Sequence, residues 1–316
     1  MMPWLGAAAL LVLAALPPIM GSYAVTLLTL VFFYAYLGQA WNILGGYAGQ
    51  LSVGHAAFVG IGAYTTTILF LRWGLTPWAG MFVGGAAAAL LGAIIGYLGF
   101  RFGLRGFYFV LLTVAFAELC RIITLNTEVT GGAVGLYITF TGDPAQFQFQ
   151  SPRAYYYVAL ALMVAATGAV WWLERSRLGA YLMAIREDEQ AAEALGIDAF
   201  RCKLVASVCS AFLSGLGGAF YAFYQFSLQP NTLFGIPLSV EIILRPIVGG
   251  AGTLLGPVLG SFILSPLAEL SRSYFSAGGW VGLHLVVYGL LLIAVVLFLP
   301  QGAYPAARRL FGRRQA

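Results

Sequence analysis

Long apolar runs alternate with short polar breaks along most of the chain, and this pattern predicts helices that cross a membrane. A spanning helix needs about 20 mostly apolar residues. We expect about ten crossings, which makes the chain an all-α, polytopic membrane helix bundle. The predicted spans are residues 4–20, 24–45, 55–72, 79–100, 106–125, 155–173, 204–226, 238–250, 255–271 and 280–299.

Composition supports the membrane class. The 316 residues are 61% hydrophobic and only 9% charged, whereas soluble domains carry about 25% charged residues. The lipid bilayer is therefore a predicted partner. The net charge of +5 does not predict nucleic acid as a partner, because cytoplasmic loops of membrane proteins carry extra bases. Cys120, Cys202 and Cys209 have spacings that fit neither a disulfide framework nor a zinc site, so no metal is expected.

The positions of the lysine and arginine residues also predict how the chain is oriented in the membrane. They gather at residues 101–105, 174–203 and 308–314. Placing all three groups in the cytosol agrees with the number of crossings and puts both termini in the cytoplasm. The chain would then be a single transmembrane domain over 1–316, with an external loop at 126–153 and a cytoplasmic loop at 174–203, the candidate for coupling to a soluble partner. An external connection of this length often serves binding; a floppy polar cap is the alternative.

Residues 174–203, here called the charged segment, hold six of the eleven acids and cannot lie in a bilayer. Acids at 187–189 suit the positive end of a helix dipole, and Gly196 is a natural helix stop. Asp198 can cap the next helix. The predicted helix over 188–196 is marginal alone, so we expect it to pack on this protein or to dock on a cytosolic partner. The residues predicted to couple the chain to that partner are Glu187, Asp188, Glu189, Gln190, Ala191, Ala192 and Gly196.

Glycine-rich stretches interrupt the apolar pattern at 45–62 and 249–260. Irregular backbone at membrane depth needs protein or a water-filled cavity to satisfy its polar groups. Paired interruptions in two halves indicate a substrate site in many transporters; two tight turns at helix crossings are the alternative. The residues predicted to line or hinge a substrate path are Gly49, Gln50, Ser52, Gly54, His55, Gly250, Gly252 and Gly256.

Small residues recur every four positions in 204–226, which predicts a face where helices pack closely rather than a pore lining. They are Ser207, Ser210, Ala211, Ser214, Gly215, Gly218 and Ala219.

Isolated charges inside apolar spans tend to pair or to mark pathways. Glu118 and Arg121 are one turn apart, and Glu241 precedes Arg245 by four residues. We expect both sets to be structural ion pairs. The lone histidines, His55 and His284, are expected to be satisfied core residues rather than metal ligands or proton relays.

ATP hydrolysis by this chain is not expected. A phosphate-binding P-loop needs Gly-x-x-x-x-Gly-Lys-Ser/Thr, and the single lysine, Lys203, follows Arg201-Cys202. No catalytic residues and no cofactor are predicted, because an enzyme would need a convergent nucleophile and base or clustered metal ligands. A stand-alone ion-coupled transporter or channel, with Glu118, Arg121 or His55 as relay, is the alternative to a subunit driven from outside.

Four stretches in order resemble branched-chain amino acid ABC permease subunits of the LivM type. They are 49–58 with 60–64, 113–118 followed by 130–132, 176–197, and 248–260. The resemblance implies the membrane part of a bacterial inner-membrane importer, with a second homologous permease, two cytosolic ATPases and a periplasmic amino-acid-binding protein. The importer motif Glu-Ala-Ala-x-x-x-Gly aligns with Gln190 to Gly196, where Gln190 replaces the glutamate. Arg245 also stands where an apolar residue is expected.

Overall fold

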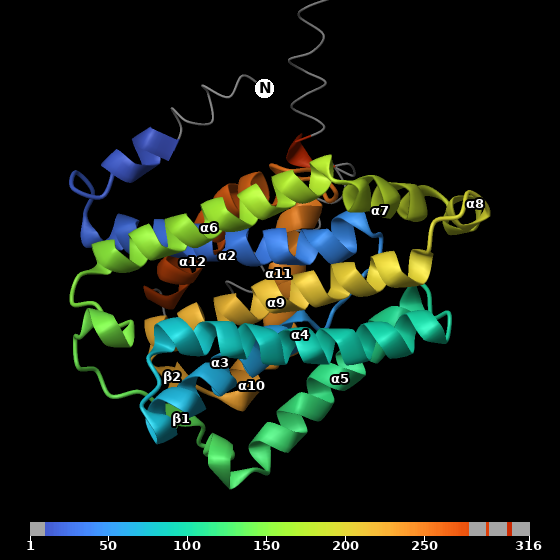
Figure 1. Cartoon of the computed structure of the whole chain (residues 1–316). Helices are drawn as coiled ribbons and strands as arrows, with labels where there is room; N and C mark the ends of the chain where they lie inside the picture. The colour runs from blue at the N-terminus through green and yellow to red at the C-terminus, as the bar shows by residue number, and fades with distance from the viewer. Residues whose placement is uncertain (1–9, 278–288, 291–301, 305–316) are drawn as a thin grey trace, which may run out of the picture.

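The computed structural model describes residues 10–277, 289–290 and 302–304, and this part of the chain is almost entirely helical (Figure 1). A helical segment at residues 10–15 precedes the named elements. In chain order these are α2 (Ser22–Trp41), η1 (Asn42–Tyr47), α3 (His55–Trp73), α4 (Pro77–Arg101), α5 (Phe107–Leu125), η2 (Glu128–Thr130), β1 (Leu136–Tyr137), η3 (Pro144–Gln146), α6 (Pro152–Arg175), α7 (Arg177–Glu187), α8 (Glu189–Ala194), α9 (Ala199–Gln225), β2 (Ser227–Leu228), α10 (Pro230–Leu233), α11 (Ile236–Gly249) and α12 (Gly256–Ala277).

Seven stretches of the described residues are long and apolar enough to cross a membrane. They are Ser22–Tyr47, His55–Trp73, Pro77–Arg101, Phe107–Leu125, Pro152–Arg175, Ala199–Gln225 and Pro230–Gly249. Each overlaps a predicted span, so the described residues agree with an all-α polytopic membrane bundle and include seven candidate crossings. The predicted span 255–271 lies in helix α12. Most of 280–299 and the first residues of 4–20 lie outside the described residues, so the total of ten and the placement of the termini stay predictions.

The ends of the long helices follow local chemistry. Pro77 begins α4 and Pro152 begins α6, where the missing N–H and fixed φ of proline are favourable. The Ser151 hydroxyl caps α6 by accepting from the Arg153 N–H. Gly74 ends α3 in the left-handed conformation, with φ +63°.

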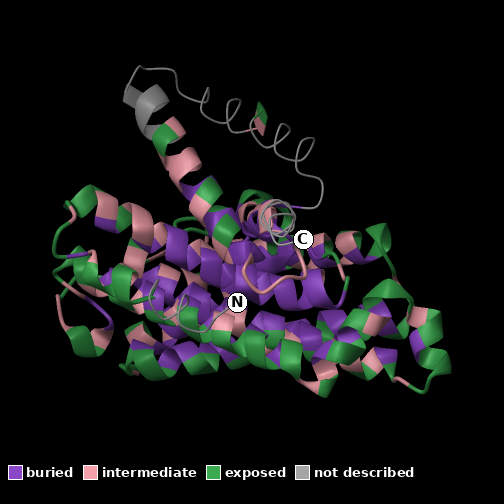
Figure 2. Cartoon of the chain, turned by 90° about the horizontal axis from the view of Figure 1, so that it is seen from above, coloured by how far each residue is buried: buried purple, intermediate pink, exposed green. Residues whose placement is uncertain are grey.

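Helix α9 lies in the middle of the bundle (Figure 1), packs against both α3 and α4, and is mostly buried. An added Cβ on Gly218 would overlap the Val59 carbonyl oxygen, and one on Gly62 would overlap that of Gly215. The backbones of α3 and α9 therefore touch. All seven predicted small residues are buried, which confirms the packing face. Figure 2 shows the buried residues gathered along the middle of the bundle, with exposed residues outside.

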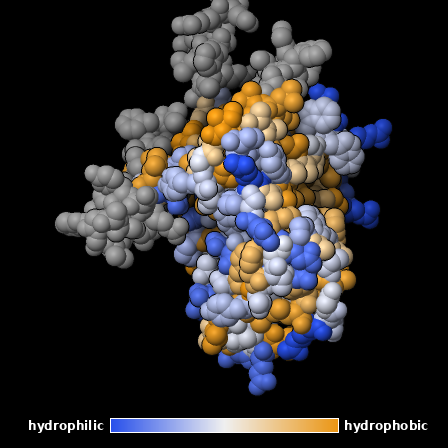
Figure 3. Space-filling model, turned by 90° about the vertical axis from the view of Figure 1, so that its left-hand side faces the viewer, coloured by the Kyte–Doolittle hydropathy of each residue, from blue (hydrophilic) through white to orange (hydrophobic). Residues whose placement is uncertain are grey.

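The segment 126–153 is folded rather than floppy. It contributes β1, which pairs antiparallel with β2 so that Leu136 lies opposite Leu228. Its Gln148 side chain is fully buried, accepts from the Thr141 N–H at 2.6 Å and donates to the Thr139 carbonyl at 3.2 Å. Figure 3 looks onto this end of the bundle, where hydrophilic and apolar residues are mixed. The segment forms an ordered cap at the end of the bundle opposite α8 (Figure 1).

Candidate functional site

The charged segment folds into α7 and α8 at one end of the bundle (Figure 1). The Asp188 carboxylate accepts hydrogen bonds from the N–H groups of Gln190 and Ala191, at 2.9 and 3.0 Å. Asp188 therefore caps α8, whereas the sequence predicts that it lies inside a helix over 188–196. Gly196 follows the helix with φ +86°, a conformation that favours glycine and ends helices.

Two details of the charged segment differ from expectation. Helix α7 was not predicted, and Glu187 is its last residue rather than part of the first turn of α8. Ser176 caps α7 by accepting from the Gly179 N–H at 3.2 Å. Leu182 and Ile185 are buried beneath it. The charged segment therefore contains two short helices, of which α8 is the more exposed.

Helix α8 is braced by ion pairs in which Lys203 and Glu189 are mostly buried and Arg105 is exposed. The Lys203 ammonium lies 2.6 Å from one carboxylate oxygen of Glu189, and Arg105 lies 3.5 Å from the other. The Lys203 ammonium is also 5.1 Å from the ring centroid of Phe100. These contacts join α8 to α9 and to the turn between α4 and α5. Ala192 adds a small apolar contact beneath the helix.

The first glycine-rich segment breaks the helical path, as predicted. Helix α2 continues into the π-helical turn η1, and residues 48–54 are irregular before α3 begins. An added Cβ on Gly54 would overlap the Thr113 carbonyl oxygen of α5. Side chains of other helices satisfy the backbone here: Trp41 Nε1 donates to Ser52 O at 2.8 Å, Val53 N donates to Thr113 Oγ1 at 3.2 Å, and Ala56 N donates to Ser239 Oγ at 3.0 Å. Protein groups therefore provide the polar partners that this depth requires.

His55 is a satisfied core residue, as expected. Its Nε2 lies 2.8 Å from the Ser210 hydroxyl, which donates its own proton to the Ala40 carbonyl at 2.7 Å. The hydroxyl must therefore accept from His55 Nε2–H, and Nδ1 accepts from the Ser52 hydroxyl at 2.9 Å. This arrangement uses the neutral imidazole to join α3 to α9. His284 lies outside the described residues.

The second glycine-rich segment is a tight turn between α11 and α12. Gly250 and Gly252 have φ +120° and +74°, which favours glycine. An added Cβ on Gly249 would overlap the Gly256 carbonyl oxygen, and one on Gly256 would overlap the Gly250 carbonyl oxygen. The turn therefore depends on close backbone contact.

The two glycine-rich segments touch each other. Asn42 donates from Nδ2 to the Thr253 carbonyl at 3.0 Å and accepts from the Gly252 N–H at 2.8 Å. Gln39 donates to the Leu254 carbonyl at 2.7 Å. We call the contact between residues 39–49 and 250–255 the glycine junction. Gln39 and Asn42 were missed from the sequence, although two amides in an apolar span were a usable signal.

Arg186 connects the charged segment to the glycine junction. From the last turn of α7 its guanidinium donates to the Gly46 carbonyl at 2.8 Å. A Cβ on Gly49 would lie 3.0 Å from Arg186 Cγ, and one on Gly252 would overlap Arg186 Nη1. The side chain therefore reaches the junction only because both positions are glycine.

The predicted path residues do not form one site. Gly49, Gly250, Gly252 and Gly256 belong to the glycine junction and its turn. Ser52, Gly54 and His55 are packed into the core beyond it, and Gln50 donates to the Ala48 carbonyl at 3.1 Å. A cavity of about 480 Å³ lies beside the junction, lined in part by Gly252 and by Glu174 and Arg175.

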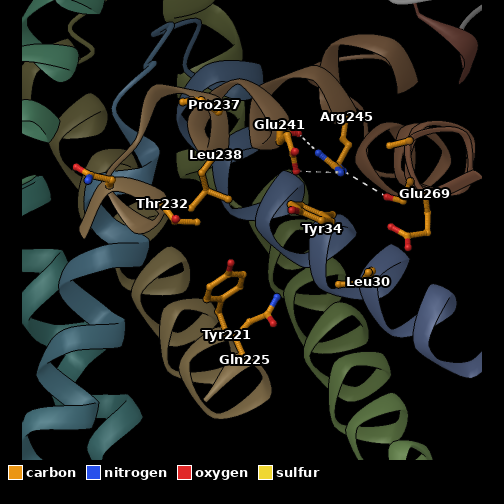
Figure 4. Close-up of a pocket in the computed structure, with 13 residues that line it drawn as sticks. Leu30, Tyr34, Tyr221, Gln225, Thr232, Pro237, Leu238, Glu241, Arg245 and Glu269 are labelled. Atoms are coloured by element: carbon orange, nitrogen blue, oxygen red, sulfur yellow. Dashed lines mark hydrogen bonds and ion pairs between the residues drawn. The ribbon is translucent and has the colours of Figure 1, made fainter. Parts of the chain in front are cut away.

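A second cavity, of about 430 Å³, lies between α2, α9, α10, α11 and α12 (Figure 4). Arg245 closes one side of it. Its guanidinium carbon is 3.5 Å from the ring centroid of Tyr34, its Nε donates to Ser265 Oγ at 3.4 Å, and an Nη donates to the Glu241 carbonyl. Arg245 Nη2 and Glu241 Oε2 are 3.7 Å apart. The predicted ion pair is present, but its place in a cavity wall was missed.

The other predicted pair is structural. Arg121 Nε donates to Glu118 Oε2 at 2.8 Å, and its Nη1 donates to Asn231 Oδ1 at 2.7 Å. The pair therefore joins α5 to α10. Neither Glu118 nor Arg121 lines the cavity around Arg245.

A family model and individual relatives indicate the same protein family for this chain. The family model described as branched-chain amino acid transport system / permease component matches residues 23–296. The high-affinity branched-chain amino acid transport system permease protein LivM of Escherichia coli K12 is 32% identical, over 95% of this chain and 74% of that protein.

More distant relatives are more varied. The probable branched-chain amino acid transport permease protein LivH of Methanocaldococcus jannaschii is 24% identical, over 77% of this chain and 79% of that protein. The fructose import permease protein FruG of Bifidobacterium longum is 28% identical, over 44% and 43% of the two chains. No solved structure matches. The match over 23–296 and the 32% identity over nearly the whole chain show that this protein belongs to the family of permease components of branched-chain amino acid transport systems.

Proposed function

We propose that this permease is the membrane subunit of an ATP-driven importer for branched-chain amino acids, or related small amino acids, in the bacterial inner membrane. Its partners would be a second homologous permease, two cytosolic ATPase subunits and a periplasmic amino-acid-binding protein. The names of the LivM and LivH relatives support the amino-acid class. One relative is named as a fructose import permease, so similar chains also occur in sugar transport.

The proposed orientation places α7 and α8 in the cytosol and the cap at 126–153 outside. The bases of the charged segment favour the cytoplasmic side. The charged segment and the cap lie at opposite ends of the bundle (Figure 1). Both termini would then be cytoplasmic, and residues 1–316 would form a single transmembrane domain.

The observation that carries the proposal is the construction of α8. A helix of six residues is marginal in water, yet this one has an Asp188 cap, a glycine stop and an ion pair from Glu189 to Lys203. It buries Ala192 but leaves Leu195 83% exposed. A held helix that presents an apolar residue to solvent suits docking of a partner protein.

Arg186 supplies a route for the resulting motion. A partner that pushes α8 would also move α7, because Asp188 directly joins the two helices. Arg186 on α7 is hydrogen-bonded to Gly46 of the glycine junction. In this proposal, ATPase closure would reach the membrane segments through that contact.

Leu195→Asp tests the proposal. The exposed side chain of Leu195 contributes little to the fold, so the variant should insert and unfold at the wild-type temperature. Truncating an apolar side chain at the centre of an interface costs about 2 kcal/mol, or about 30-fold in affinity. We expect co-purification of the ATPase subunits and ATP-driven leucine uptake in reconstituted vesicles to fall by about that factor.

Val134→Asp is the matched control, because Val134 is 68% exposed and lies in the cap at the other end of the bundle. It should leave ATPase association unchanged. Normal ATPase association in Leu195→Asp would contradict the proposed docking helix. Uphill uptake by vesicles that contain this chain and no other protein would favour the ion-coupled alternative instead.

A further inference from the structure

The cavity around Arg245 has features of a built binding site rather than of a packing gap. Its volume of about 430 Å³ lies within the range of about 300–1,000 Å³ that is typical of small-molecule sites. Pro237 and Leu238 form an apolar part of the wall on one side of Glu241, and Arg245 and Glu269 lie on the other side (Figure 4). This division suits a ligand with one charged and one apolar end.

The position of Arg245 argues for a function beyond stability. It lies within a membrane-spanning stretch and its side chain is only 2% exposed. Charged residues inside membrane segments are expensive and tend to mark substrate pathways. The Glu241 side chain that faces it is 42% exposed, so a buried guanidinium here borders a carboxylate that a ligand in the cavity can reach.

The guanidinium is positioned but not saturated by its neighbours among the described residues. Tyr34 stacks on it, Ser265 accepts from Nε, and one Nη donates to a backbone carbonyl. The Glu241 carboxylate lies 3.7 Å away, beyond the length of a hydrogen bond. Arginine has five N–H donors in a planar fork that matches a carboxylate. A ligand carboxylate is thus a suitable additional partner.

The charged residues in the cavity wall favour a ligand that carries both a positive and a negative charge. Among the described residues of the lining, the base Arg245 and the acid Glu241 face each other. A lone anion would face the Glu241 carboxylate, and a lone cation would face the buried guanidinium. We propose that this cavity binds the zwitterionic head group of an α-amino acid, with its carboxylate on Arg245 and its ammonium group on Glu241. The side chain of the amino acid then lies against Pro237 and Leu238. This inference rests on the proposed function.

Binding of tritiated L-leucine to the complete transporter in lipid nanodiscs tests the assignment. The binding protein and ATP are left out, so that the signal comes from the membrane subunits. Two competitors each lack one charge: leucinamide has no carboxylate, and 4-methylpentanoate has no ammonium group. The variants are Arg245→Lys and Glu241→Gln. The matched controls are Arg201→Lys and Asp198→Asn, an ion pair at the start of α9 whose residues do not line the cavity.

We expect Arg245→Lys to weaken leucine binding about tenfold while leucinamide binding changes little, because lysine keeps the charge but loses the planar fork. Glu241→Gln should weaken leucine about tenfold and leave 4-methylpentanoate unchanged. Both controls should bind leucine as the wild type does. This split between analogues would not arise from a structural role, which would lower all three affinities together.

Two outcomes overturn the assignment: no saturable leucine binding by the wild-type complex, or an equal loss for leucine, leucinamide and 4-methylpentanoate in the cavity variants. ATPase association, measured on the same samples, reports on the proposed function separately. If the ATPases do not associate but the cavity variants affect leucine and its analogues differently as expected, the amino-acid site is supported and the proposed ATPase coupling is refuted. If the ATPases associate but the variants affect all three ligands equally, the coupling is supported and the amino-acid site is refuted.

Discussion

Comparing Gly252→Ala with a control variant should separate two contributions to the loss of stability. One is the cost of placing alanine in a left-handed conformation, and the other is the cost of opening the glycine junction. Gly252 has φ +74°, and an added Cβ would overlap Arg186 Nη1 and lie 2.9 Å from the Gly46 carbonyl oxygen. Gly103 has a similar φ of +65°, and its Cβ position has no neighbour within 4 Å among the described residues. Gly103→Ala is therefore the matched control.

The expected magnitudes follow from these two environments. Both alanines adopt a left-handed conformation, which costs about 1–2 kcal/mol. Only Gly252→Ala must also displace the Arg186 guanidinium from its hydrogen bond to Gly46. Hydrogen bonds to charged groups contribute about 1.5–3 kcal/mol. The free energy of unfolding should fall by about 2.5–5 kcal/mol in Gly252→Ala and by about 1–2 kcal/mol in Gly103→Ala.

Two measurements check this prediction: thermal unfolding in one detergent, and leucine uptake per ATP hydrolysed in vesicles that contain the full transporter. Gly252→Ala should reduce uptake per ATP about tenfold or more, because the contact between α7 and the junction is broken. Gly103→Ala should keep the wild-type ratio. Equal unfolding temperatures and equal uptake ratios in the two variants would refute the role given to Arg186.

Two further predictions concern buried polar contacts. Lys203→Met should lower the free energy of unfolding by about 1–3 kcal/mol, because the mostly buried Glu189 carboxylate loses its closest partner; adding Glu189→Gln should recover most of that loss in chemical unfolding, and no recovery would contradict the pairing. His55→Ala should cost about 1–3 kcal/mol, because the Ser52 hydroxyl loses its acceptor. Uptake by His55→Ala should keep the wild-type pH profile, and a shifted profile would instead identify His55 as a proton relay.

The spans and α8 could be predicted because their signals are local. Twenty apolar residues in a row admit few structures in a membrane chain. Asp188 starts a helix and Gly196 ends one through their own backbone conformations and contacts. The break before His55 was also visible, since glycine and polar residues interrupt an otherwise apolar run.

Helix α7 and the glycine junction needed tertiary information. Helix α7 carries several charges, and its apolar residues Leu178, Leu182 and Ile185 form a short stripe that was hidden by the acids after it. The junction joins residues 210 to 215 positions apart in the sequence. An amide in an apolar span shows that a polar partner exists but not which one. The role of Arg245 was missed for the same reason, since a pair in sequence explains its charge without revealing the cavity.

The cavity and the glycine junction share one helix. Glu241 and Arg245 lie on α11, which ends at Gly249, where the junction turn begins. Gly250 is five residues beyond Arg245, or about 7.5 Å along a helix axis. On the other side, an added Cβ on Gly260 of α12 would overlap the Arg245 carbonyl oxygen, so α12 holds this part of α11 closely.

Pro246 makes this part of α11 easier to bend than the rest of the helix. It removes one backbone hydrogen bond inside α11, and proline is a usual cause of helix bending. Motion of the junction turn would therefore bend α11 next to Arg245 rather than carry the whole helix. Glu241 and Arg245 are one turn apart on the part of α11 that this bend affects, so a bend there would alter the 3.7 Å separation between their charged groups.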